Sequence, residues 1–306
     1  MALIRAFETR VGALYRTSAI PGFIHTSVGQ EAVAVGVCQA LRADDWVATT
    51  HRGHGHCLAK GADVDAAMAE LFGKASGLCK GKGGSMHIAD AAKGILGANA
   101  IVGASVPLAV GAALSAKLLG TDGVAVAFFG EGAVAQGAFH EAINLAAIWD
   151  LPAIFVCENN HYAEFTDSRT MSRRETVAEI GAAYGVDGRR IDGNDVEAVH
   201  EAAADAVVRC RHGGGPALLE AMTYRWQGHY EGDPQAYKPS DEVDEWHARD
   251  PLAIARARLE ERGVAAAVEL DRIVRDAEER VDAAEAFARS AEYPAEEEAF
   301  TDVYSA

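Results

Sequence analysis

The stretch AVAFFGEGAVAQGAFHEAINLAAIWDLPAIFVCENNHYA, residues 125–163, decides the fold class. It begins with an apolar run, turns at a pair of glycines, continues with a helical pattern and returns to a second apolar run. Short, continuously apolar strands that are separated by helices are typical of a parallel sheet buried on both faces. This stretch therefore predicts one strand–helix–strand unit of an α/β fold.

The same alternation extends along most of the chain. Helical patterns cover 2–17, 29–41, 63–73, 104–119, 135–149, 175–184 and 195–212, and strand-like runs cover 46–50, 123–129, 152–157, 186–191 and 216–222. We therefore expect a doubly wound α/β fold, with a mostly parallel sheet and helices on both faces. Residues 74–100 and 226–245 break the pattern, and loops of that length inside a compact domain are usually functional or disordered.

The composition narrows the function classes. The chain has 306 residues and a net charge of −17, which disfavours nucleic acid as a partner because nucleic-acid binding needs a basic surface. No signal-peptide pattern and no apolar run of about 18 residues is present, so no membrane association is expected. The five cysteines are scattered and none forms a CxxC pair, which favours a reducing, cytoplasmic setting over a zinc ribbon.

The C-terminal part, at about 250–290, has a charged helical pattern. We interpret it as a helical extension of a single domain that spans residues 1–306. An amphipathic helix with a solvated face explains the pattern, and docking onto a partner subunit is the alternative.

The glycine turn contains an acid where a nucleotide-binding turn would meet a phosphate. A dinucleotide-binding turn requires the spacing GxGxxG, which Gly130, Gly132 and Gly137 do not meet. Glu158, at the end of the next strand, could serve as a ribose-binding acid. However, Glu131 would repel a pyrophosphate at the low dielectric of a buried turn, and a helix N-terminus only softens that repulsion.

A divalent cation between Glu131 and a diphosphate removes this conflict. Consecutive strands of a parallel sheet end at the same edge, so Asn160, which follows the next strand, can meet the same ion. The backbone carbonyl of Tyr162 can add a third ligand. Carboxylate, amide and carbonyl oxygens together with substrate phosphates are the ligands that Mg²⁺ prefers. The sequence therefore predicts a magnesium site at Glu131, Asn160 and Tyr162.

The GEG turn followed by NN resembles the metal motif of thiamine diphosphate enzymes, in which GDG precedes NN. Further segments resemble, in order, the α subunit of a thiamine diphosphate-dependent 2-oxoacid dehydrogenase E1 component: PGFIHTSVGQEAVAVG, HRGHG, GKGGSMH and IVGASVPLAVGAA. The resemblance covers residues 2–305 and implies the thiamine diphosphate-binding fold. YAE after NN and GHYEGDPQAYK resemble the acetoin dehydrogenase members, and the glutamate of GEG is also found in branched-chain members.

The resemblance implies a cofactor site for thiamine diphosphate and Mg²⁺. Arg52 would contact the diphosphate, which suits its planar, always charged guanidinium. The backbone at Ala100 and Val102 would meet the aminopyrimidine ring. The N–H groups of Gly132 and Ala133 would bind the diphosphate.

Three histidines receive roles from the same resemblance. His229 would reach the mouth of the site as a catalytic and cofactor-binding residue, and His25 would line the substrate pocket as a catalytic residue. His51 would be cofactor-binding, although many members have tyrosine there. A metal cluster of His51, His54 and His56 is a further interpretation, which the absence of a neighbouring acid in the sequence disfavours.

The resemblance also implies an activity and partners. The chain would cleave the C–C bond next to the carbonyl of a small molecule, acetoin first, and pass the acyl unit to a lipoyl group of a partner acyltransferase. It would act only with an E1 β subunit, in an α₂β₂ heterotetramer, because a glutamate that the cofactor needs comes from that subunit. The alternatives are pyruvate or a branched-chain 2-oxoacid as donor, an NAD-dependent oxidoreductase, and a non-catalytic subunit.

One departure from the family concerns the residues after His229. Mitochondrial members have a regulatory serine where this chain has Tyr230, so kinase control at that position is not expected. We predict that Tyr230 and Glu231 shape the substrate end of the pocket instead.

Overall fold

The sheet of the predicted α/β fold is present. The computed structural model describes residues 1–303. Its main sheet has six strands in the order β2-β1-β3-β4-β8-β7, and all of its pairings are parallel. The strands are β1 (Trp46–Ala48), β2 (Ile95–Gly97), β3 (Ala125–Gly130), β4 (Ala153–Asn159), β7 (Asp187–Asp192) and β8 (Ala217–Met222). The doubly wound fold class is therefore confirmed.

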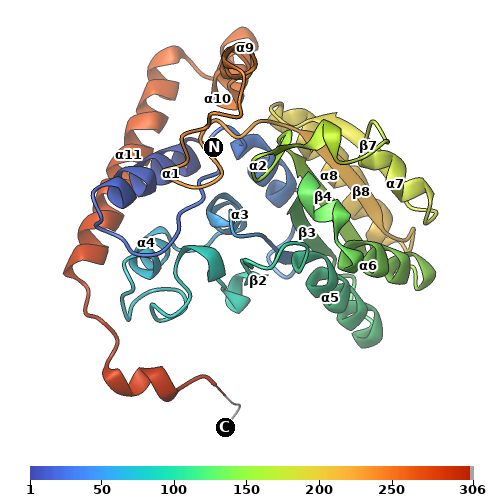
Figure 1. Ribbon diagram of the computed structural model, residues 1–306, viewed down its shortest axis with the longest axis horizontal. Helices are drawn as coiled ribbons and strands as arrows, with labels where there is room; N and C mark the ends of the chain where they lie inside the picture. The colour runs from blue at the N-terminus through green and yellow to red at the C-terminus, as the bar shows by residue number, and fades with distance from the viewer. Residues whose placement is uncertain (304–306) are drawn as a thin grey trace.

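Helices cover both faces of this sheet (Figure 1). Alternate residues of β3 enter two different cores: Val126 and Phe128 pack on one face, and Phe129 packs on the other, as the two-residue period of a strand requires. The first face carries α1 (Ala2–Arg16), α2 (Glu31–Gln39), α3 (His54–Lys60), α4 (Val64–Leu71), α8 (Val196–Arg211) and α11 (Ala267–Ser290). The second carries α5 (Ser105–Leu119), α6 (Gly137–Ile148) and α7 (Ala178–Ala182).

The strand order reverses between β1 and β3. The chain passes from β1 to its neighbour β2 and then returns to place β3 on the other side of β1. In doubly wound sheets, ligands bind in the crevice beyond the carboxyl ends of the strands at such a reversal. The loop after β1 and the turn after β3, which contain Arg52 and Glu131, lie at this crevice.

Several short elements were not predicted. The segment 74–100, expected to be irregular, contains two single 3₁₀ turns, η1 (Ser85–His87) and η2 (Ala91–Lys93), and the edge strand β2. Helix α3 begins at His54 within HRGHGH, where the glycines and histidines leave no recognisable helical pattern of apolar residues. Elements of three to seven residues are too short for periodicity to reveal. A small antiparallel pair, β5 (Tyr162–Ala163) and β6 (Thr166–Asp167), follows the NN motif.

The predicted helical tail consists of two helices, α10 (Pro251–Glu261) and α11, and α9 (Ser240–His247) precedes them. Val281, Ala284 and Ala288 bury one side of α11 against the body, where it packs on α1 and α4 (Figure 1). Its other side is charged and exposed, as expected for a solvated face. No helix within residues 1–303 is both long and apolar enough to cross a membrane.

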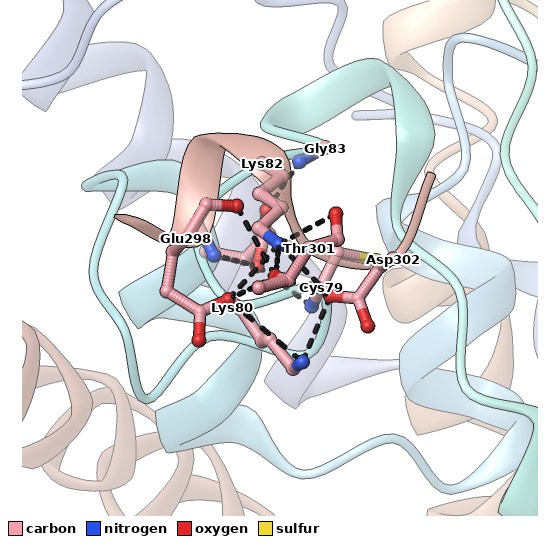
Figure 2. A network of polar contacts seen from close by, with 9 residues as sticks. Cys79, Lys80, Lys82, Gly83, Glu298, Thr301 and Asp302 are labelled. Atoms are coloured by element: carbon pink, nitrogen blue, oxygen red, sulfur yellow. Dashed lines mark hydrogen bonds and ion pairs between the residues drawn. The ribbon is translucent and has the colours of Figure 1, made fainter. Parts of the chain in front are cut away.

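The C-terminal segment is fastened to the glycine-rich loop at 79–84. Lys80 and Lys82 form ion pairs with Asp302, and Lys82 also contacts Glu298 and Thr301 beside η5 (Glu296–Phe300), as Figure 2 shows. We call these five residues the C-terminal clasp. Beneath the loop, the carboxylate of buried Glu70 accepts four backbone N–H groups at 2.8–3.0 Å, from Cys79, Gly81, Gly83 and Gly84.

Candidate functional site

A cavity of about 330 Å³ lies at the crevice where the strand order reverses. We call it the main cavity. It is lined by all of the residues that were predicted to be catalytic or to bind the cofactor or the metal: His25, His51, Arg52, Ala100, Val102, Glu131, Gly132, Ala133, Asn160, Tyr162 and His229. The fold therefore brings the predicted residues together, while their individual roles remain proposals.

Glu131 is a buried carboxylate that forms no ion pair in the described part of the chain. It directly follows β3 and is 6% exposed. One carboxylate oxygen accepts the backbone N–H of Asn160 at 3.2 Å, whereas Oε1 has no hydrogen-bond partner among the described residues. Burial raises the pKa of Glu131 to about 7. A buried carboxylate that lacks a partner is costly, and a bound cation would remove this cost.

Asn160 and Tyr162 lie beside Glu131 as the metal prediction requires. The Asn160 side chain donates to Gln30 at 3.1 Å and accepts the N–H of Tyr162 at 3.3 Å, which fixes its orientation. The Tyr162 hydroxyl is occupied elsewhere, since it donates to Glu242 at 2.7 Å. This contact does not affect the predicted metal site, because the predicted ligand is the backbone carbonyl of Tyr162. Carboxylate and amide oxygens on neighbouring strand ends thus fit a magnesium ion.

Two buried arginines supply positive charge to the main cavity. Arg52 donates to the carbonyls of Thr26 at 2.6 Å and His229 at 3.0 Å. Arg225 donates to the Tyr237 hydroxyl at 2.6 Å. Burial, followed by the charge of Arg225, lowers the pKa of Arg52 to about 9. Because no carboxylate within residues 1–303 is bonded to these two guanidiniums, the cavity suits an anion such as a diphosphate.

Arg225 and Gln30 are site residues that the sequence analysis missed. Gln30 immediately precedes α2 and Arg225 follows β8, so each reaches the main cavity from an element far from the GEG and NN motifs. The only sequence signal for Arg225 is its place at the carboxyl end of an apolar strand, which is where ligand contacts gather in such sheets.

His25, His51 and His229 meet on one side of the main cavity, with ring nitrogens within 4.8 Å of one another. Burial, followed by the charge of Arg52, lowers their pKa values to about 3, about 2 and about 4, respectively. All three imidazoles are therefore neutral at pH 7, so each can donate at one nitrogen and accept at the other. The Nδ1 of His25 is buried and has no hydrogen-bond partner in residues 1–303.

His54 and His56 do not join His51 in a metal cluster. His54 bonds Glu8 at 2.9 Å and Ser85 at 2.8 Å, whereas His56 bonds Thr49 at 2.7 Å and lies 3.2 Å from Glu158. The absence of a nearby acid in the sequence is the wrong reason to reject the cluster, since Glu8 and Glu158 are neighbours of these histidines in space. What separates the histidines is that each has hydrogen-bond partners of its own.

The loop that carries His229 is held from within. The Asp233 carboxylate accepts the N–H of His229 at 2.6 Å and the hydroxyl of Tyr237 at 2.7 Å. The Lys238 ammonium donates to the carbonyls of Arg225 at 2.5 Å and Gln227 at 2.7 Å, and burial lowers its pKa to about 7. These contacts give His229 a defined position at the cavity.

Tyr230 and Glu231 do not line the main cavity. Glu231 turns toward α1 and accepts from Arg16 at 2.7 Å, and Tyr230 packs its ring edge against Phe23. The prediction that these two residues shape the substrate end of the pocket is therefore wrong. The ion pair with Arg16 holds the Glu231 side chain away from the main cavity.

The rim of the main cavity is apolar and open. Ile101 is 72% exposed and Val102 is 50% exposed, and both line the cavity beside the segment predicted to meet the aminopyrimidine. Exposed apolar side chains at the mouth of a site are typical of a surface that a partner covers.

The chain is similar to known proteins over nearly its whole length. The family described as "Dehydrogenase E1 component" matches residues 1–297. The chain is 50% identical to the α subunit of acetoin:2,6-dichlorophenolindophenol oxidoreductase of Bacillus subtilis, over 99% of this chain and 91% of that one. It is 47% identical to the protein of the same name from Cupriavidus necator, over 99% of this chain and 92% of that one. It is 43% identical to the pyruvate dehydrogenase E1 α subunit of Rhizobium meliloti, over 99% of this chain and 87% of that one.

Proposed function

The chain belongs to the dehydrogenase E1 component family, and from this premise we propose that it is the thiamine diphosphate- and Mg²⁺-dependent α subunit of an acetoin dehydrogenase. One observation carries the proposal. The unpartnered carboxylate oxygen of Glu131, the Asn160 side chain and the buried guanidinium of Arg52 border one cavity. The carboxylate and an anionic diphosphate can then share a site because a cation lies between them.

The protein groups in the main cavity have complementary tasks. Glu131 and Asn160, with the carbonyl of Tyr162, would hold the cation, and Arg52 and Arg225 would bind the diphosphate. Thiamine diphosphate supplies, when bound, the carbon nucleophile for cleavage of a C–C bond next to a carbonyl. The N–H groups of Gly132 and Ala133 would orient the diphosphate, and the backbone at Ala100 and Val102 the aminopyrimidine ring.

The neutral histidines suit the substrate side of the cavity. An uncharged imidazole can donate a hydrogen bond to a carbonyl or hydroxyl oxygen and accept one from a hydroxyl. The buried Nδ1 of His25 has no partner, and the N–H of His229 is held by Asp233. We infer that His25 and His229 contact the substrate and that His51 supports the cofactor.

The open rim supports the need for a second subunit. The relatives from Bacillus subtilis and Cupriavidus necator are named α subunits. Ile101 and Val102 are exposed beside the cavity, where an E1 β subunit of an α₂β₂ assembly would cover them. A lipoyl-bearing acyltransferase would then accept the acyl unit. The five cysteines are free, which agrees with a cytoplasmic location.

Acetoin is preferred over pyruvate as the donor because the identity to the two acetoin oxidoreductase α subunits exceeds that to the pyruvate dehydrogenase subunit. The test is turnover of the chain alone and with its β subunit on acetoin, pyruvate and 2-oxoisovalerate, with 2,6-dichlorophenolindophenol as electron acceptor. We expect turnover only with both subunits, and highest kcat/KM on acetoin. Turnover by the chain alone contradicts the subunit proposal, and higher kcat/KM on a 2-oxoacid contradicts the donor.

A further inference from the structure

A second cavity, of about 690 Å³, borders the main cavity at Glu131. The segment after β4 forms the wall between them: Asn160 and Tyr162 line the main cavity, whereas Asn159 and His161 line the second cavity. The second cavity is therefore bordered by the backbone segment that carries the predicted metal ligands.

The arginines of the chain are distributed unevenly with respect to their ion pairs. Most of them pair with a carboxylate. Those that form no ion pair within residues 1–303 are Arg52 and Arg225 in the main cavity, Arg173, Arg174 and Arg190 at the second cavity, and Arg272 and Arg275 on the exposed side of α11.

Arg173, Arg174 and Arg190 are exposed and form no ion pair within residues 1–303, although the chain has 45 acidic residues and only 28 basic ones. Arg173 and Arg174 come from the segment before α7, and Arg190 comes from β7, so two separate elements bring these charges to one cavity. By contrast, Arg169, which also lines the cavity, is paired with Asp167 and Glu242. Guanidinium groups that converge without an internal carboxylate suit an anion that is supplied from outside.

His161 adds a second, independent observation. Its Nε2 is buried and has no hydrogen-bond partner among the described residues, although a buried polar atom normally finds one. Its backbone φ is +72°, a left-handed conformation that non-glycine residues rarely adopt. Such strained residues cluster at ligand sites and switch segments.

The rest of the lining suits the organic part of a ligand. Val177, Ile180 and Met222 are apolar, and Tyr184 offers an aromatic ring whose hydroxyl bonds His140 at 2.8 Å. The volume lies within the range of small-molecule sites. We propose that the second cavity binds a phosphorylated organic anion of nucleotide size, with its phosphates at Arg173, Arg174 and Arg190 and its organic part beside Tyr184.

This site goes beyond the proposed function. Asn159 and His161 share a backbone segment with Asn160 and Tyr162, so the two sites are neighbours along one segment of the chain.

The test uses the full chain co-purified with its β subunit and saturated with thiamine diphosphate and Mg²⁺. ADP is titrated into this complex in a calorimeter, and pyrophosphate is titrated as a probe without an organic part. The charge-removing variant is R173A/R190A. The matched control is R272A/R275A, which removes the same number of unpaired, exposed arginines from α11. A further variant, Tyr184→Ala, tests the organic part.

We expect ADP to bind the wild type and the control equally and R173A/R190A at least tenfold more weakly. Tyr184→Ala should weaken ADP but not pyrophosphate. Absence of ADP binding, or equal weakening in both double variants, overturns the proposal. The proposal is also overturned if the complex binds an acidic protein domain at these arginines and does not bind ADP. Because calorimetry measures binding and not turnover, failure here is distinguishable from failure of the proposed activity.

Discussion

The main cavity and the C-terminal clasp both gather charged side chains, but in opposite arrangements. In the cavity, Glu131, Arg52 and Arg225 are buried and form no ion pair with any residue that the structure describes. In the clasp, Lys82 lies within 3.0 Å of Glu298 and 2.8 Å of Asp302, and these groups are accessible to solvent (Figure 2). Water already solvates the exposed pairs, so they add little stability, whereas a buried charge without a partner is costly. The costly arrangement is the one that indicates a ligand.

The comparison predicts its largest effect at Arg52. Arg52→Met should weaken thiamine diphosphate binding at least a hundredfold, about 3 kcal/mol, because it removes a charged ligand and leaves the carbonyls of Thr26 and His229 unpaired. Calorimetry on the complex with the β subunit measures this. Arg42→Met, which removes an exposed arginine paired with Asp122, is the control and should bind normally. A similar loss in both variants would contradict the assignment.

A smaller effect is expected at Asp233, which touches no predicted cofactor group but holds His229. Asp233→Asn should lower kcat/KM about tenfold. The NH₂ group of asparagine cannot accept one of the hydrogen bonds that the carboxylate accepts in this loop, and His229 is misplaced as a result. Asp241→Asn on exposed α9 is the matched control and should leave kcat/KM unchanged. The pH profile of kcat/KM should move with Asp233→Asn. An Asp233 variant with wild-type kinetics would show that the loop needs no such restraint.

The buried histidines predict a pH dependence of stability. The pKa of His25 is about 3 in the folded chain, below its ordinary value of 6.5, because burial disfavours the charged ring. The unfolded chain therefore binds more protons below pH 6.5, and folding stability is lost as pH falls from 6.5 toward 3. When the pH falls from 7.5 to 4.5, the free energy of unfolding, measured in urea, should decrease by about 2 kcal/mol less in His25→Asn than in the wild type. His212→Asn, at an exposed histidine, is the control, and parallel curves for wild type and His25→Asn would refute the assignment.

The smallest effect is expected in the clasp. Lys82→Ala should change the melting temperature by no more than about 2 °C, and less still in high salt, because exposed ion pairs are screened. Cofactor affinity should stay at the wild-type value. A large loss of either would show that the clasp supports the cavity through the loop at 79–84, and the comparison would then fail.

The sequence predicted the parts of the site that lie next to strong local patterns. Glu131 and Asn160 follow two buried strands that are consecutive in the chain, so a parallel sheet alone brings them to one edge. Apolar periodicity likewise placed the longer helices and strands to within about three residues, an ordinary margin for helix and strand ends.

The missed parts depend on contacts between distant segments. Arg225 and Gln30 reach the cavity from β8 and from the start of α2, and no spacing in the sequence links them to GEG or NN. The acids beside His54 and His56 lie on α1 and β4. Glu231 was misplaced for the same reason, since its partner Arg16 is at the other end of the chain. Tertiary packing decides such neighbours.

The most direct test of the central claim is the dependence of thiamine diphosphate binding on a divalent cation. Binding is measured by calorimetry on the complex with the β subunit, with Mg²⁺ and with a chelator, for wild type and Glu131→Gln. Glutamine keeps the size of Glu131 but loses the charge that holds the cation. We predict that the wild type binds the cofactor tightly only with Mg²⁺ and that Glu131→Gln binds it at least a hundredfold more weakly. Tight binding without a divalent cation, or unchanged binding by Glu131→Gln, would contradict the claim that a metal ion lies between Glu131 and the diphosphate.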